Sequence, residues 1–216
     1  MDARKSFHQQ LDDLYSELVR MSGQAVETVE RTREAFWNLD PDLAGRIIED
    51  DDRLDEHIVN IEENGIDLIA TQAPVAIDLR TIFVIMKLAM HFERVGDLCV
   101  NICKAVRNMG TLNVSLWTRD NINEMFTNAR RMLERAMESF RKKDVAMAEE
   151  LSLMDDAVDR INRAFITGAN REDEAGMESV VRVVMIARFL ERIADHAVDI
   201  GENVRYMVTG QFQAEP

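Results

Sequence analysis

The chain has 216 residues, a length that can bury a large core, and its 31% charged and 6% aromatic residues are typical of a helix-rich protein. Forty acidic against 26 basic residues give a net charge of −14, which argues against nucleic acid or anionic lipid as the main partner. We expect a cytoplasmic protein without a transmembrane segment, since no secretory leader opens the sequence and its apolar runs are too short to span a bilayer.

The first predicted element is a long helix. Positions seven residues apart, from Leu11 through Leu18 and Ala25 to Leu39, are mostly apolar. This pattern predicts a helix of about 35 residues with a coiled-coil-like seam. The helix should end at 38–41, where Asp40 and Pro41 form a suitable N-cap and first-turn pair for the next helix.

Two further helices are predicted before the first linker. The second runs from Pro41 to just before Thr71, and its apolar stripe contains Asp51, with Asp55 one turn later. The third runs from about residue 78 to 109. Residues 110–118 are rich in Gly, Asn, Ser and Thr, and form the only linker-like segment.

After the linker the pattern starts again. The segment ERVGDLCVNI at 93–102 recurs as ERIADHAVDI at 191–200, so Glu93 corresponds to Glu191. A different offset relates the first two helices to the later residues, so that Asp51 corresponds to Asp155. We therefore predict an all-α fold of two tandem three-helix bundles, formed by the repeats 1–112 and 115–216. The second repeat has fewer residues between its last two helices, where 168–176 replace the Gln-Ala-Pro turn of the first repeat.

Carboxylates occupy stripe positions at equivalent places in both repeats. The predicted facing pairs are Asp51 and Asp55 with Glu93 and Asp97, and Asp155 and Asp159 with Glu191 and Asp195. Acids four residues apart lie on one face of a helix. Because buried carboxylates without partners are very costly, either arginines or a metal ion must neutralise them.

Spacing alone leaves both explanations open. Arg94 and Arg192 stand beside the acids, and Arg53 and Arg160 lie close by, so an arginine network without metal is one possibility. Clusters of oxygen ligands also suit hard cations or iron, and less typically zinc. His196 follows Asp195 directly and so points round the helix from it, which favours a surface or interface residue over a ligand.

Taken together, the doubled ERVGDLCVNI motif, the acids of the second helix and the segment QAPVAIDLR at 72–80 resemble the PhoU family of phosphate uptake. The resemblance covers nearly the whole chain. It implies a cytoplasmic negative regulator that links the phosphate ABC transporter ATPase to the sensor histidine kinase of the phosphate regulon. It also implies metal ions held by E/DxxxD motifs, most simply iron or zinc in multinuclear form, with magnesium or manganese as alternatives.

Carried over by position, the implied metal ligands are Asp51, Asp55, Glu93, Asp97, Asn101, Asp155, Asp159, Glu191, Asp195 and Asp199. The repeats differ in two respects. The first motif ends in Asn101 and the second in Asp199, so the two sites can differ in affinity. The segment QAPVAIDLR has no counterpart in the second repeat.

Other function classes remain open at this level. A di-iron enzyme of the ferritin type needs Glu-x-x-His ligands, and none of the four histidines has an acid three residues before it. No nucleophile–base pair or phosphate-binding glycine loop is present either, so we expect no enzymatic activity. A metal-free helical scaffold is the other alternative. We expect protein partners and a homo-oligomer, most simply a dimer.

Overall fold

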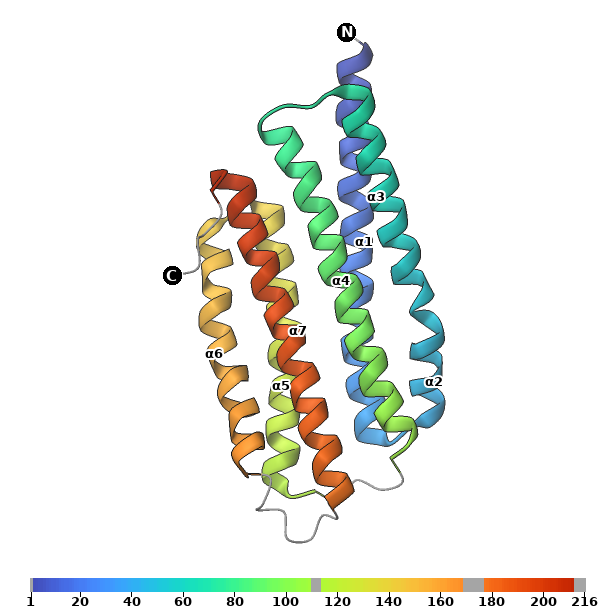
Figure 1. Cartoon of the computed structure of the whole chain (residues 1–216), viewed down its shortest axis with the longest axis vertical. Coiled ribbons are helices and arrows are strands. Elements are labelled where there is room, and N and C mark those ends of the chain that lie inside the picture. Colours follow the sequence, from blue (N-terminus) through green and yellow to red (C-terminus); the bar gives the residue numbers. More distant parts are fainter. Residues whose placement is uncertain (1, 110–113, 169–176, 212–216) are drawn as a thin grey trace.

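The structure, a computed structural model, describes residues 2–109, 114–168 and 177–211, and within these ranges the secondary structure is helical (Figure 1). The helices are α1 (Asp2–Asn38), α2 (Pro41–Asp50), α3 (Asp52–Gln72), α4 (Ile77–Arg107), α5 (Leu116–Lys142), α6 (Val145–Gly168) and α7 (Met177–Thr209). The predicted all-α class is confirmed. None of these helices combines the length and the apolarity that crossing a bilayer requires.

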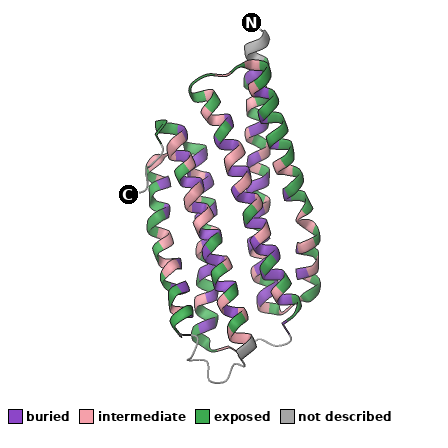
Figure 2. Ribbon diagram, in the orientation of Figure 1, coloured by how far each residue is buried: buried purple, intermediate pink, exposed green. Residues whose placement is uncertain are grey.

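The helices form two three-helix bundles that lie side by side (Figure 1). In the first bundle, α2 and α3 continue one another along α1 and α4, and the second bundle consists of α5, α6 and α7. The bundles meet where α4 packs against α7 and α1 against α5. Figure 2 shows buried residues on the inward faces of the helices, and these residues form one continuous hydrophobic cluster across both bundles.

The same turn follows the first helix of each bundle. Leu39 and Lys143 both have positive φ, at 49° and 53°, and each is followed by an aspartate. The backbone N–H of Asp40 donates to the Ala35 carbonyl at 3.0 Å, and Asp144 makes the equivalent bond at 3.0 Å. Both aspartates then cap the next helix, as an N-cap carboxylate does when it accepts from the first free N–H groups. This shared turn supports the internal repeat independently of the sequence motif.

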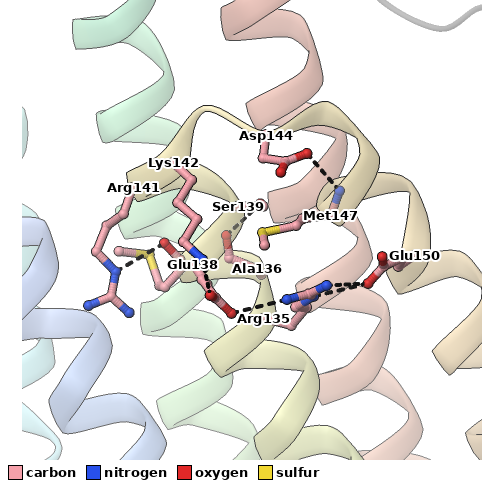
Figure 3. Close-up of polar contacts among 10 residues, drawn as sticks. Arg135, Ala136, Glu138, Ser139, Arg141, Lys142, Asp144, Met147 and Glu150 are labelled. Atoms are coloured by element: carbon pink, nitrogen blue, oxygen red, sulfur yellow. Dashed lines mark hydrogen bonds and ion pairs between the residues drawn. The ribbon is translucent and has the colours of Figure 1, made fainter.

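Ion pairs surround the turn between α5 and α6 (Figure 3). Arg135 Nη1 contacts Glu138 Oε2 at 3.1 Å on the same helix, and Arg135 Nε donates to Glu150 Oε2 at 3.1 Å across to α6. Lys142 Nζ lies 2.6 Å from Glu138 Oε1. Solvent weakens exposed pairs of this kind, so they contribute less than the apolar faces to joining the helices.

The sequence predicts one helix from Pro41 to just before Thr71, whereas the structure divides this segment into α2 and α3 at Asp51. Asp51 keeps right-handed helical dihedrals (φ −63°, ψ −33°), but its carbonyl accepts from Leu54 N at 2.8 Å and from Asp55 N at 3.4 Å. The helix therefore tightens locally instead of ending. Three consecutive aspartates, 50–52, stand at this point, and their mutual repulsion and low helix propensity weaken the regular helix here.

The linker predicted at residues 110–118 ends earlier in the structure than expected. Helix α5 begins at Leu116, because the Ser115 hydroxyl caps it by accepting from Thr118 N at 3.2 Å. Residues 110–113 of the linker lie outside the described residues. So do residues 169–176, where the sequence places the altered connection of the second repeat.

Candidate metal centre

The acids of the second bundle converge between α6 and α7. Asp155 and Asp159 lie one turn apart on α6, and Asp195 faces them from α7. Each of the three offers a carboxylate oxygen, and these oxygens all lie within 4.8 Å of one another. Three negatively charged ligand atoms at this separation match the oxygen-rich environment that divalent cations prefer.

Glu191 completes this group, which we call the α6–α7 acid cluster. Its side chain is on α7, one turn before Asp195, and the residue is only 7% exposed. One oxygen pairs with Arg188, whereas Oε2 is buried without a partner among the described residues, as is Asp155 Oδ1. Buried carboxylate oxygens without partners are strongly unfavourable. The residues therefore fit a bound cation, which would supply the missing partner.

The pKa values of these acids are raised, because their buried negative charges lack sufficient partners. Burial, with the charges of Asp195 and Asp159 beside it, raises the pKa of Asp155 to about 7. Burial followed by the Asp195 charge raises the pKa of Glu191, although Arg188 opposes this shift. Burial and the Asp159 charge likewise raise the pKa of Asp195. At neutral pH part of the cluster is protonated unless a cation is present.

The first bundle has an equivalent but more open group, the α3–α4 acid cluster. It consists of Asp51 at the α2–α3 junction, Asp55 on α3, and Glu93 and Asp97 on α4. Burial, then the charges of Asp55, Asp97 and Glu93, raises the pKa of Asp51 to about 6. Burial and the Asp97 charge also raise the pKa of Glu93. Within the described parts of the chain, only the α6–α7 acid cluster brings three carboxylate oxygens within 4.8 Å.

Gly96 on α4 allows the α2–α3 junction to approach the α3–α4 acid cluster. A Cβ at this position would lie 2.7 Å from Asp51 Oδ1 and 2.6 Å from Leu54 Cδ1. Ala194 occupies the corresponding position on α7. The close approach of Asp51 to α4 therefore depends on the missing side chain.

Arginines neutralise these clusters only in part. Arg94 contacts Asp97 at 2.8 Å and Glu93 at 3.4 Å, but it is 55% exposed. In the second bundle Arg163 contacts Asp159 at 2.8 Å, and Arg188 contacts Glu191. Of the arginines that the sequence suggested, Arg53 pairs instead with Asp50.

Sequence reasoning missed Arg163 and Arg188. Their spacing of four and three residues from cluster acids on the same helix was the available signal.

The last residue of each predicted ligand motif lies one helical turn beyond the last acid of its cluster. Asn101 is exposed on α4, beyond the last acid of its cluster. Asp199 lies on α7 with its Oδ2 at 3.6 Å from both His91 Nδ1 and His196 Nδ1, between the two bundles. Burial lowers the pKa of His91 to about 4, although the Asp199 charge opposes that shift, so the ring is neutral at pH 7. His196 is an interface residue, in line with its expected orientation.

Comparison with known proteins identifies one family along both repeats. The profile of the PhoU domain matches residues 18–106 and 122–204. The chain is 31% identical over 214 residues to a protein of Mycobacterium leprae named phosphate-specific transport system accessory protein PhoU homolog 1, covering 97% of this chain and 95% of that one. A Clostridium acetobutylicum homologue with the corresponding name is 30% identical, covering 96% of each chain.

Solved structures show the same fold. The crystal structure of PhoU from Pseudomonas aeruginosa superposes with a TM-score of 0.87 at 28% identity, covering 95% of this chain and all of that chain. The phosphate transport system regulatory protein PhoU from Streptococcus pneumoniae gives a TM-score of 0.84 at 22% identity, covering 97% of this chain and all of that one. The second likeness concerns the fold alone.

Proposed function

The chain belongs to the PhoU family, and from this membership and its two acid clusters we propose that it is a metal-binding negative regulator of phosphate uptake. The observation that carries the proposal is the doubled family match over nearly the whole chain, with a carboxylate cluster at the equivalent place in each repeat. The relatives are named as accessory proteins of phosphate-specific transport systems. The function proposed is therefore regulatory and not enzymatic.

The proposed partners are proteins in the cytoplasm. They are the ATPase of the phosphate ABC transporter and the sensor histidine kinase that controls phosphate-starvation genes. A net charge of −14 supports a protein partner over nucleic acid, since like charges repel. We propose that the chain acts as a homodimer, which would present two copies of each surface to these partners.

Metal ions, most simply iron or zinc, with magnesium or manganese as alternatives, would be held by the two acid clusters. Asp155, Asp159, Glu191 and Asp195 would bind from α6 and α7, and Asp51, Asp55, Glu93 and Asp97 would bind from the α2–α3 junction, α3 and α4. A cation at either place neutralises the facing acids, and thereby fixes the spacing of two helices on one surface of each bundle. Partner proteins would then bind a surface whose geometry depends on whether the clusters hold metal.

Gene deletion tests the regulatory role. Removal of the gene should leave phosphate-starvation genes expressed in phosphate-rich medium, and the wild-type gene should restore repression. The double variant Glu93→Ala and Glu191→Ala should restore it poorly if both clusters act in regulation. Unchanged expression after deletion under high phosphate would contradict the regulatory assignment.

Metal loading of the two clusters can be measured separately. Protein purified without chelators should contain metal by elemental analysis, and the double variant Asp155→Asn and Asp195→Asn should lose the fraction held by the α6–α7 acid cluster. The amides keep the shape of the carboxylates, so the fold should persist. Glu62→Gln with Glu63→Gln, two exposed acids of α3, removes the same charge as a control. Absence of metal from all preparations would favour the metal-free scaffold.

A further inference from the structure

Two histidines and one aspartate meet between the bundles, outside both acid clusters. His91 Nδ1 on α4 lies 3.2 Å from His196 Nδ1 on α7. Asp199 Oδ2, also on α7, lies 3.6 Å from each of these two nitrogens. Three atoms that can each offer a lone pair therefore form a nearly equilateral triangle at the contact of α4 with α7.

The size of this triangle distinguishes between coordination geometries. A tetrahedral zinc ion with ligand distances of about 2.0–2.1 Å separates its ligand atoms by about 3.3–3.4 Å. An octahedral ion with ligand distances of about 2.1 Å separates adjacent ligands by only about 3.0 Å. The observed separations of 3.2, 3.6 and 3.6 Å match the tetrahedral arrangement more closely.

Hydrogen bonds among the three residues suit their ring nitrogens and carboxylate less well than a shared cation would. A bond between two Nδ1 atoms needs the proton on one ring and a lone pair on the other, so the two neutral rings must adopt opposite tautomers. His196 Nε2 is buried without a partner among the described residues, which leaves the Nδ1 edge as the side of that ring with polar contacts. A cation at the centre of the triangle would accept lone pairs from both Nδ1 atoms and from the carboxylate.

We propose that His91, His196 and Asp199 bind one zinc ion that joins α4 to α7, and so links the two bundles. Two imidazoles and a carboxylate suit zinc better than magnesium or calcium, which prefer oxygen ligands alone. Asn203 Nδ2 lies 3.5 Å from His91 Nε2, on the far side of that ring, and donates to the Asp199 carbonyl at 2.8 Å. Zinc on Nδ1 would leave the proton of His91 on Nε2, so in the bound state the Asn203 amide would turn its oxygen toward that ring and accept from it.

The fourth coordination position would be open to solvent. A pocket lined by Phe83, Lys87 and Met90 also has His91 and Asp199 in its wall. Water from this pocket would complete the tetrahedron. The proposed site goes beyond the metal binding of the acid clusters, because it contains nitrogen ligands and belongs to both bundles.

Cobalt substitution tests the site separately from the acid clusters. Protein freed of metal with a chelator should take up one Co²⁺ per chain with the strong visible absorption of a tetrahedral nitrogen-containing site, and one equivalent of Zn²⁺ should displace it. The all-oxygen clusters favour octahedral Co²⁺, whose absorption is far weaker. His91→Gln and His196→Gln should abolish the band, and Asp199→Asn should weaken zinc binding at least tenfold, a loss expected when one of three protein ligands is removed.

Matched controls make the result decisive. His57→Gln removes a histidine that pairs with Glu17 in the first bundle, and it should leave the cobalt spectrum unchanged. The Asp155→Asn and Asp195→Asn variant should also keep the band. Circular dichroism checks the fold of each variant, and the isosteric Asp199→Asn keeps the test valid if a histidine variant unfolds. Failure to form a tetrahedral band, or a band that survives Asp199→Asn and both histidine variants, would overturn the proposal.

Discussion

Each acid cluster contains more negative charge than the arginines beside it neutralise. In the α6–α7 acid cluster, Arg163 and Arg188 contact one acid each, yet buried oxygens of Asp155 and Glu191 remain without partners among the described residues. An arginine network would lower the pKa values of such acids, whereas burial and mutual repulsion raise the pKa of Asp155 to about 7. The arginines beside the cluster therefore leave part of its negative charge without compensation, in keeping with the metal binding proposed for it.

The raised pKa of Asp155 predicts how stability depends on pH when metal is removed. Its pKa is about 7 in the folded chain and about 3.9 in the unfolded chain. Between these values the folded state binds more protons than the unfolded state, so the free energy of unfolding should fall as pH rises from about 4 to about 7. Asp155→Asn should make this decline shallower, because the other acids with raised pKa values still contribute to it, and should raise the stability at pH 7 by about 1 kcal/mol after allowing for solvent screening at a half-buried site.

Urea denaturation in the presence of a chelator measures this effect across the pH range. Glu62→Gln, which removes an exposed acid of α3, should leave the pH dependence parallel to that of the wild type. Identical pH dependence of Asp155→Asn and the wild type would contradict the assigned cause.

The partners of individual acids were predictable only within one bundle. Four-residue spacing on each helix, together with the doubled motif, was sufficient to group Asp155 and Asp159 with Glu191 and Asp195, because helical geometry fixes which residues share a face. Asp199 follows the same spacing, yet its carboxylate lies beside His91, more than 100 positions away. That contact depends on how the two bundles pack together, which no local pattern encodes.

At the scale of elements, the contact between the α2–α3 junction and α4 positions the first acid cluster. Asp51 has helical dihedrals, so an apolar stripe that continues through it predicts one unbroken helix. The break becomes apparent only from the hydrogen bonds and from the contact with Gly96. A glycine inside a helix costs about 1 kcal/mol relative to alanine, and here the close approach of Leu54 and Asp51 explains it.

Gly96→Ala should therefore destabilise the protein although alanine is the better helix former. The new methyl group would lie 2.6 Å from Cδ1 of Leu54, which is fully buried and has little room to move. Overpacking of this kind costs about 1–3 kcal/mol, and contact with a fully buried side chain places the cost in the upper part of this range, above the gain of about 1 kcal/mol in helix propensity. Chemical denaturation should show a net loss of up to about 2 kcal/mol.

Gly23→Ala provides the matched control for this substitution. Gly23 is exposed in the middle of α1, and a Cβ there would meet nothing within 4 Å. This change should stabilise the protein by about 0.5–1 kcal/mol. Equal changes in the free energy of unfolding for the two substitutions would show that the close contact at Gly96 does not affect stability.

At the scale of the whole molecule, the two repeats share one core. Aromatic side chains join α1 to α5, with Tyr15 stacked on Phe140 at a centroid distance of 5.3 Å and Phe36 at 6.1 Å from Phe126. The internal repeat was predictable because each copy keeps its own stripe and motif. The side-by-side packing of the two copies was not predictable, because the apolar residues at the contact between the bundles look like ordinary core positions in the sequence.

A shared core predicts that both repeats unfold together. Each bundle contains one of the two tryptophans, Trp37 on α1 and Trp117 on α5, where Trp117 packs against Phe165. The variants Trp37→Phe and Trp117→Phe each leave a single tryptophan as fluorescent reporter. Trp37→Phe leaves the one in the second bundle, and Trp117→Phe leaves the one in the first.

Separation of the bundles would expose the apolar contacts of α4 with α7 and of α1 with α5 to water, which is unfavourable by about 25 cal/mol per Å² of apolar surface. The two reporters should therefore give the same urea midpoint once each is corrected for its own substitution by circular dichroism, as coincident probes do in a two-state transition. Two separate midpoints, with the fluorescence of one tryptophan changing while that of the other keeps its native value, would show that the bundles unfold as independent domains.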